Sequence, residues 1–152
     1  MTEARVRGFT LIELVVVIAI AALMLALVLP SGQHRRQHDA LSTGAHEIAS
    51  ALRLTRSRAI TANQPTSFIV DVATGFYRPA GASAAVPMPA GSHVTLYTAE
   101  EEALSEGVGT IRFYPDGSSS GGGIAISLGR ERVQVLVDWL TGGVSIHEQP
   151  AG

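Results

Sequence analysis

The sequence predicts an α+β fold, in which a long N-terminal helix packs on a β-rich head built from antiparallel sheets. An apolar run extends from Phe9 to Leu29. Beyond it, apolar residues recur every three or four positions as far as Ile60, a spacing typical of one helix face. Short runs of alternating apolar and polar residues follow Pro65 and are typical of strands with one buried face.

Residues 1–8 form a short leader that carries Arg5 and Arg7, and the apolar segment 9–30 follows it. From Phe9 to Leu29 the segment is about 31 Å long as a helix, close to the hydrocarbon thickness of a bilayer. We therefore expect a transmembrane helix. A secretory signal peptide is the alternative, but the run is longer than the apolar region of such a peptide and lacks an Ala-x-Ala exit.

Glu13 is the only carboxylate in this apolar run. Placing a charged side chain in a bilayer costs about 2.5–3.5 kcal/mol on the mildest scales, so an acidic residue there indicates a function. The alternative is that Glu13 lies near the helix start and reaches the membrane surface. Positive residues do not orient the segment, because two Arg residues precede it and two follow it closely.

Segment 31–62 is predicted to be the amphipathic half of the long helix, on the other side of the membrane from the leader. Pro30 lacks a backbone N–H and should kink or loosen the helix near the membrane. The apolar face of the segment consists of Leu41, Ala45, Ile48, Leu52, Ala59 and, beside them, Ile60. We expect this face to lie on a sheet.

Residues 63–152 are predicted to form the β-rich globular head. The expected strands are 66–72, 75–78, 93–98, 110–114, 123–128, 132–139 and 144–147. A surface loop is expected at 79–89, which is rich in Ala, Gly and Pro, and an acidic loop or short helical turn at 100–106. Alternation in the later strands indicates antiparallel sheets with one buried face.

The composition argues against several classes of function. The chain has no cysteine, which rules out disulfides and thiolate chemistry. Its formal net charge is −2, which provides no basic field for a polyanion, so no nucleic-acid partner is expected.

Four groups of side chains could form other sites. They are the cluster Arg53, Arg56 and Arg58, the pair His34 and His38, the Ser- and Gly-rich run 118–123, and the acid or base groups Asp71, Asp116, Asp138 and His147. Charges on a helix face are usually solvated, and the His pair has little carboxylate support. The Ser- and Gly-rich run lacks the Lys and the helix of a phosphate site, and the acid or base groups lie on separate turns and strands. We expect no catalytic residue, no metal and no cofactor.

A resemblance to a known family adds to these predictions. Its residues are Gly8-Phe9-Thr10-Leu11-Ile12-Glu13-Leu14 and the apolar run that follows. This stretch resembles the prepilin cleavage and methylation motif of type IV pilins and type II secretion pseudopilins. The resemblance implies cleavage between Gly8 and Phe9 by a prepilin peptidase and N-methylation of Phe9. It also implies a role in assembly for Glu13 and a helix kink at Pro30.

The physical chemistry of the apolar segment agrees with a role for Glu13. The new amino group of Phe9 and the Glu13 carboxylate carry opposite charges, and each is costly alone in a medium of low dielectric constant. A pair between neighbouring subunits would relieve both costs. It would also set their axial register, because apolar helices have little else to distinguish one offset from another.

A second pair of stretches narrows the resemblance. They are Phe113-Tyr114-Pro115-Asp116-Gly117-Ser118-Ser119-Ser120-Gly121-Gly122 and Val137-Asp138-Trp139-Leu140-Thr141-Gly142-Gly143-Val144. They resemble the C-terminal half of the H-type minor pseudopilins, the GspH/FimT-like branch of the type IV pilin-like superfamily. The pilin-like fold of that family is a long N-terminal helix on two antiparallel sheets. Residues 80–109 match no pattern that identifies partner-binding loops, and no acidic cluster after Asp138 matches the calcium loop of the major pseudopilin.

The resemblance implies a structural, non-enzymatic subunit of the periplasmic pseudopilus of a type II secretion system, at or near its tip. We expect a single-pass protein of the bacterial inner membrane with its C-terminal domain in the periplasm. Its expected partners are other minor and major pseudopilins, the prepilin peptidase, the inner-membrane assembly platform, and secreted cargo or the secretin.

Two alternatives stay open. The chain could be a minor pilin of a type IV pilus that acts in pilus assembly or DNA uptake, although no Arg or Lys follows Arg132 to hold DNA. It could also be an unprocessed, membrane-tethered binding module, and the state of the bond between Gly8 and Phe9 would distinguish that class.

Overall fold

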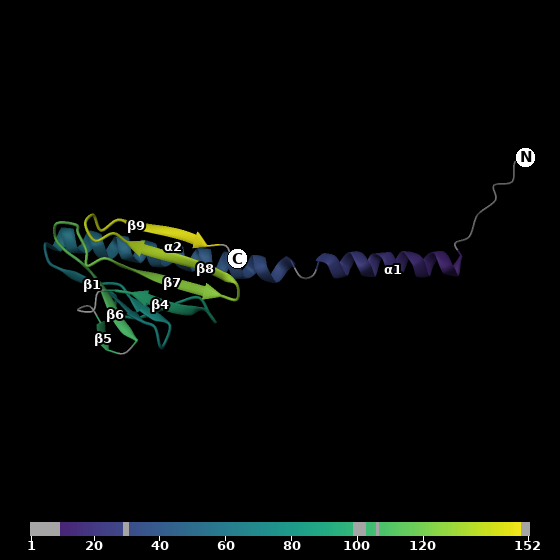
Figure 1. Ribbon diagram of the computed structural model, residues 1–152, viewed down its shortest axis with the longest axis horizontal. Coiled ribbons are helices and arrows are strands. Elements are labelled where there is room, and N and C mark those ends of the chain that lie inside the picture. Colours follow the sequence, from purple (N-terminus) through teal and green to yellow (C-terminus); the bar gives the residue numbers. More distant parts are fainter. Residues whose placement is uncertain (1–9, 29–30, 99–102, 106, 150–152) are drawn as a thin grey trace, which may run out of the picture. The chain divides into compact units, whose positions relative to one another are not determined.

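The computed structural model describes residues 10–28, 31–98, 103–105 and 107–149 (Figure 1). It describes the side chains of all these residues except 26–28, 31–36 and 103–105. The chain divides into two compact units, Met1–Arg36 and Gln37–Gly152. Each unit is described by itself.

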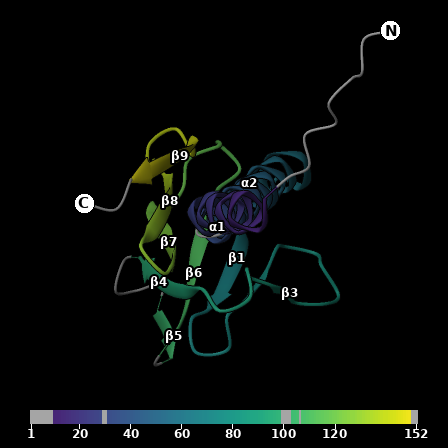
Figure 2. The ribbon, with the colours of Figure 1, turned by 90° about the vertical axis from the view of Figure 1, so that its right-hand side faces the viewer.

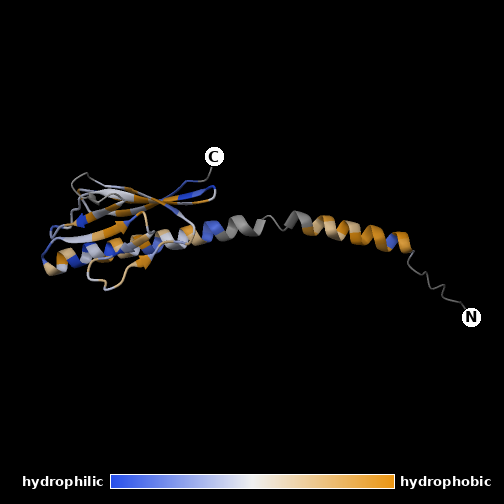
Figure 3. Cartoon of the chain, turned by 90° about the horizontal axis from the view of Figure 1, so that it is seen from below, coloured by the Kyte–Doolittle hydropathy of each residue, from blue (hydrophilic) through white to orange (hydrophobic). Residues whose placement is uncertain are grey.

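In the first unit, helix α1 spans Leu11–Val28, and Glu13 is its only charged residue. Figure 3 shows this helix as strongly hydrophobic apart from that position. Within the described residues, no helix is long and apolar enough to cross a membrane. Pro30 lies outside the described residues, so the kink remains a prediction.

Helix α2 spans Ser31–Ala62 and supplies the head with one fully buried face. That face consists of Leu41, Ala45, Ile48, Ala49, Leu52, Thr55 and Ala59. The predicted face is confirmed except at Ile60, which is exposed because it follows Ala59 by about 100° of helical turn. Thr55 joins the face without an unpaired hydroxyl, since its Oγ1 donates to the Ala51 carbonyl oxygen at 2.8 Å.

The end of α2 is fixed by its own backbone. Asn63 adopts a positive φ of 50°, which turns the chain out of the helix. The N–H of Asn63 then donates to the Ile60 carbonyl at 3.3 Å, and that of Gln64 to the Ala59 carbonyl at 3.2 Å. These bonds form the Schellman arrangement that commonly ends helices, and Pro65 directly follows it.

Two antiparallel sheets form the rest of the head. The five-stranded sheet has the order β3-β2-β1-β6-β5, with β1 at Thr66–Asp71, β2 at Phe76–Arg78, β3 at Val86–Pro87, β5 at Ala103–Ser105 and β6 at Val108–Phe113. The four-stranded sheet has the order β4-β7-β8-β9, with β4 at His93–Tyr97, β7 at Gly122–Leu128, β8 at Glu131–Val137 and β9 at Val144–Gln149. The predicted α+β class with antiparallel sheets is confirmed.

All seven expected strands are present, with ends that differ from the prediction by two residues or fewer. Two short strands were missed. β3 lies inside the loop predicted at 79–89, and β5 lies inside the loop or helical turn predicted at 100–106, so both predictions are wrong at those residues. Each of these strands is defined by its pairing with a neighbouring strand and not by alternating apolar and polar residues in its sequence. β3 pairs with β2 through only two residue pairs, and β5 pairs with β6 with a shift in register.

The core lies between α2 and both sheets. Figure 2, which looks along the helix, shows the four-stranded sheet on one side of α2 and strands β1 and β6 below it. Phe68 of β1 and Ile124 of β7 are fully buried in the same apolar cluster as Leu52. Phe68 also stacks on Tyr77, with ring centroids 5.3 Å apart. One continuous core therefore joins the helix to the two sheets.

Gly44 marks a close approach of the backbone in the middle of α2. The ring of Pro89, from the loop before β4, lies against it, and a Cβ at Gly44 would overlap the ring Cγ. Glycine inside a helix costs about 0.5–1 kcal/mol relative to alanine, so this residue is retained at a cost to the helix. The close packing of Pro89 provides a reason.

We predict that Gly44→Ala lowers the melting temperature of the purified chain. The gain in helix propensity is smaller than the cost of overpacking, which is typically about 1–3 kcal/mol. Thermal unfolding followed by circular dichroism measures the change. In a Pro89→Ala background the same substitution should be neutral or stabilising, and Ser50→Ala, at an exposed position of α2, is the control. Equal loss in both backgrounds would contradict the steric explanation.

Candidate functional site

The structure describes Glu13, the predicted assembly residue. Gly8 and Phe9, where cleavage and methylation are predicted, lie outside the described residues. Glu13 is exposed in the first turn of α1. Its backbone N–H donates to the Thr10 carbonyl oxygen at 3.1 Å and to Thr10 Oγ1 at 3.3 Å. Thr10 therefore caps the helix at this residue.

The spacing of Thr10 and Glu13 is that of a capping box, Thr-x-x-Glu. A carboxylate in the first turn is also favoured by the positive end of the helix dipole. Glu13 was singled out as a charge in an apolar run, and this local role was not predicted. The Thr-x-x-Glu spacing in the sequence would have indicated it. Glu13 thus has a reason to lie at the helix start that is independent of any neighbour.

The turn after β6 is held by Asp116. Its Oδ1 accepts hydrogen bonds from the Ser118 hydroxyl at 2.6 Å and from the Ser118 N–H at 3.0 Å. These bonds, that from the hydroxyl first, hold the pKa of Asp116 below its ordinary value. Gly117 closes the turn with a φ of 87°, and its N–H donates to the Tyr114 carbonyl at 2.9 Å.

The turn between β8 and β9 is held in the same way by Asp138. Its Oδ1 accepts from the Thr141 hydroxyl at 2.7 Å and from the Thr141 N–H at 2.8 Å, and these bonds lower the pKa of Asp138. The backbone closes twice more, from Gly142 N–H to the Asp138 carbonyl and from Asp138 N–H to the Gly143 carbonyl, each at 2.9 Å.

Hydrogen bonds from Ser119 join these two turns, and Arg56 holds the first of them to α2. Ser119 donates its N–H to the Trp139 carbonyl at 2.9 Å and its hydroxyl to the Asp138 carbonyl at 3.0 Å. Arg56 of α2 donates its Nε–H to the Gly117 carbonyl at 2.9 Å. A side chain at Gly142 would overlap both that carbonyl and Arg56. We call this unit, formed by residues 114–121 and 138–143 with Arg56, the Arg56 corner.

Two large apolar side chains project from the Arg56 corner into solvent. Trp139 is 66% exposed and Leu140 is 64% exposed. The sequence analysis used this stretch only for its family resemblance and did not single out either residue. The sequence nevertheless contained a signal for their exposure. Asp138, Thr141 and Gly142 are residue types typical of a turn, and the two large apolar residues lie between them.

The three Arg residues of the predicted cluster serve different contacts. Arg53 donates from Nη2 to the Val144 carbonyl at 3.0 Å, and Arg56 reaches Gly117. The Arg58 guanidinium lies against Gly81, on the loop between β2 and β3. They do not act together as one patch.

The candidate acid and base groups are also engaged locally. Asp71 Oδ1 accepts from the Thr74 N–H at 3.0 Å, and His147 Nε2 lies 3.2 Å from Ser145 Oγ. Asp116 and Asp138 both belong to the Arg56 corner, but each is bonded within its own turn. Among the described residues, no hydrogen bond joins any two of the four.

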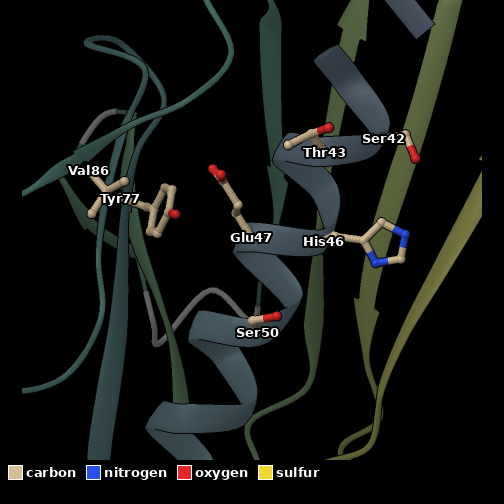
Figure 4. Close-up of a pocket in the computed structure, with 7 residues that line it drawn as sticks. All are labelled: Ser42, Thr43, His46, Glu47, Ser50, Tyr77 and Val86. Carbon is tan, nitrogen blue, oxygen red and sulfur yellow. The ribbon is translucent and has the colours of Figure 1, made fainter. Parts of the chain in front are cut away.

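A pocket of about 670 Å³ opens beside α2 and is lined by Ser42, Thr43, His46, Glu47, Ser50, Tyr77 and Val86 (Figure 4). Glu47 points toward the Tyr77 ring, whereas His46 points away from it. Burial, and then the charge of Glu47, raise the pKa of Tyr77, so this phenol stays protonated near neutral pH. Among the described residues, no hydrogen bond joins a Ser or Thr hydroxyl of this lining to His46 or Glu47, and the Ser42 hydroxyl donates to Glu148 instead.

The described part of the chain has no group of three His, Asp or Glu side chains placed to hold a metal ion. The side chain of His34, one half of the predicted His pair, lies outside that part. His38 instead faces acidic groups, with its ring nitrogens 3.8 Å from Asp39 Oδ1 and 3.8 Å from Glu148 Oε2.

We predict that the Asp138 turn makes stability depend on pH. Because the pKa of Asp138 is lower in the folded chain than its ordinary value of 3.8, its contribution is fully present above that value. The contribution is lost as the pH falls through the folded pKa. Urea unfolding of Asp138→Asn should therefore show a smaller loss of stability than the wild type between about pH 5 and pH 3.

Two further variants test the cause. Thr141→Val removes the hydroxyl whose hydrogen bond is the largest cause of the lowered pKa of Asp138, so it should reduce the pH dependence in the same direction. Thr95→Val, at an exposed position of β4, is the control and should keep the wild-type profile. An unchanged profile in both Asp138→Asn and Thr141→Val would refute the prediction.

Comparison with known proteins agrees with this architecture. The family model described as Type II transport protein GspH matches residues 44–143, and that of the prokaryotic N-terminal methylation motif matches residues 4–29. The chain is 31% identical over 144 residues to the Type II secretion system protein H of Xanthomonas campestris pv. campestris, which covers 95% of this chain and 85% of that protein.

Two solved structures share the fold. The minor pseudopilin EpsH from the type 2 secretion system of Vibrio cholerae matches with a TM-score of 0.52 at 12% identity, over 74% of this chain and 98% of that one. The type IV minor pilin FimU of Pseudomonas aeruginosa matches with a TM-score of 0.50 at 12% identity, over 76% of this chain and 92% of that one. At such identity the likeness concerns the fold alone.

The family resemblance inferred from the two sets of motifs is thus confirmed. The GspH match covers most of the chain, and the Xanthomonas relative covers nearly all of it. The chain belongs to the GspH family, the H-type minor pseudopilins of type II secretion.

Proposed function

We propose that this chain acts by assembly, as a subunit that is cleaved between Gly8 and Phe9, methylated at Phe9 and built into a pseudopilus at or near its tip. One observation carries the proposal. A methylation motif over residues 4–29 and a GspH head over residues 44–143 occur together in one chain. The motif supplies a means of processing and anchoring, and the head supplies surfaces for contact.

In this proposal Glu13 pairs with the methylated amino group of Phe9 on a neighbouring subunit. α1 offers no other charged side chain for such a contact. The cost of either charge alone in an apolar medium favours the pair, and the pair sets the axial offset between subunits. The bonds to Thr10 hold the Glu13 backbone in the first turn of α1, which places the side chain at the start of the helix.

The proposed location is the bacterial inner membrane, with segment 9–30 as the single span and the head in the periplasm. The apolar composition of α1 supports this placement. The proposed partners are the other pseudopilins, the prepilin peptidase, the inner-membrane assembly platform, and cargo or the secretin at the tip. This scheme needs no catalytic group, and the three candidate Asp residues accept hydrogen bonds within turns.

The minor-pilin alternative has less support. The likeness to FimU lies in the fold, which secretion and pilus subunits share. DNA uptake would favour a cluster of cations on the head, yet the three Arg residues of α2 contact separate loops. The match to a type II secretion protein H over nearly the whole chain favours secretion.

We predict that mass spectrometry of the chain purified from its own bacterium finds an N-terminus at N-methylated Phe9. Gly8→Val should block cleavage and leave the leader attached, because the larger side chain disturbs the motif at the cut bond. Gly44 lies outside the methylation motif at residues 4–29, so Gly44→Ala should be processed normally. A wild-type N-terminus at Met1 would overturn the proposal and favour the unprocessed binding module.

We also predict that Glu13→Gln is processed and reaches the membrane but enters the pseudopilus poorly, since the neutral amide cannot balance the amino group. Secretion by a deletion strain that carries this variant should fall at least about tenfold, the change expected from about 1.4 kcal/mol. Val15→Ala, at an exposed site of α1, is the control and should secrete normally. Normal secretion with Glu13→Gln would exclude the charge pair.

A further inference from the structure

We infer that Trp139 and Leu140 form an apolar knob that docks the head onto another pseudopilin, in a hollow edged by a carboxylate. The inference rests on the proposed function, because it takes the chain to be a subunit of the fibre. It goes further by naming the side chains that contact the neighbour and the chemistry of the surface that receives them.

The first argument is exposure. Trp139 is 66% exposed and Leu140 is 64% exposed, and they are adjacent in one turn. Aromatic side chains, Trp above all, contribute a disproportionate share of binding energy at protein interfaces. Exposure of both side chains to water does not stabilise the isolated head. A partner that covers them removes apolar surface from water, which favours binding.

The second argument is rigidity. The Asp138 carboxylate accepts two hydrogen bonds from Thr141 within the turn. The Ser119 N–H donates to the Trp139 carbonyl at 2.9 Å and so ties the turn to the neighbouring segment. A Cβ at Gly121 would lie 3.0 Å from Trp139 Cβ, so the base of the Trp side chain is packed against the backbone. A knob that is already ordered loses little conformational entropy on binding.

The third argument is charge. Arg53 donates to the Val144 carbonyl at the end of this turn, and Arg56 donates to the Gly117 carbonyl of the adjoining turn in the Arg56 corner. Neither guanidinium lies within ion-pair distance of a carboxylate among the described residues. In contrast, the carboxylates of Asp116 and Asp138 already accept two local hydrogen bonds each. The unused donors beside the knob therefore fit a carboxylate on the partner.

The position of the knob favours a protein partner over lipid. Arg56 lies 19 residues after Gln37, where the head begins, which corresponds to about 28 Å along α2. A surface at that distance from the start of the head is suited to meet the head of another subunit. A second copy of this chain and a lipid surface are outcomes that the experiment distinguishes.

The test uses the full chain in a strain of its own bacterium that lacks the gene. A photo-crosslinking amino acid is placed at Leu140, and the products are identified by mass spectrometry. We expect a crosslink to a different pseudopilin, and we expect Trp139→Ser with Leu140→Ser to reduce secretion about tenfold or more, as loss of an interface hot spot would. Arg53→Glu should weaken the crosslink, and Arg53→Lys should preserve it.

The matched control is Leu54→Ser with Phe76→Ser, which removes one exposed aliphatic and one exposed aromatic side chain elsewhere on the head and should secrete normally. Limited proteolysis checks that each variant head is folded. A crosslink to a second copy, to lipid or to a protein that is not a pseudopilin would overturn the inference, as would full secretion by the Trp139 and Leu140 variant. Unimpaired secretion by the deletion strain itself would instead contradict the proposed function.

Discussion

The buried face of α2 is the constraint on which the rest of the head depends. Leu41, Ile48 and Leu52 are almost completely removed from solvent by residues of both sheets. Burial of such side chains contributes about 1.5–3 kcal/mol each, far more than the surface ion pairs of His38. The two sheets share no strand, and this helix face lies in the single apolar core that contains residues of both.

The Arg56 corner extends the same helix into the turns. Arg56 lies on α2 three residues before the fully buried Ala59, so the packing of α2 also fixes where its guanidinium can reach. From there it contacts Gly117, and Gly142 lies too close to both to carry a side chain. Two segments that are separate in the sequence, 114–121 and 138–143, thereby become one surface, and their joint resemblance to the family has a structural explanation.

The sequence predicted the elements in which apolar residues recur at regular spacing. The three-and-four spacing around Leu52 and the alternation through Val135 both indicate a buried face, and both faces are buried. The short strand β3 was missed because two residue pairs leave no pattern to detect. The Arg56 corner could not be predicted either, since its bonds join residues of three elements and none of them shows in local spacing. The strand expected at 132–139 included Asp138 and Trp139, whereas β8 ends at Val137 and both residues lie beyond it.

The proposed pair at Glu13 and the proposed knob at Trp139 would solve different problems. A carboxylate that meets an N-terminal amine accepts any neighbour with a free N-terminus, so it sets an offset without selecting a partner. Selection requires shape and charge that other subunits do not match, which the helix α1, with Glu13 as its one charged residue, cannot supply. The head must supply them. A rigid turn with two exposed apolar side chains and two adjacent cations has the features that such discrimination needs.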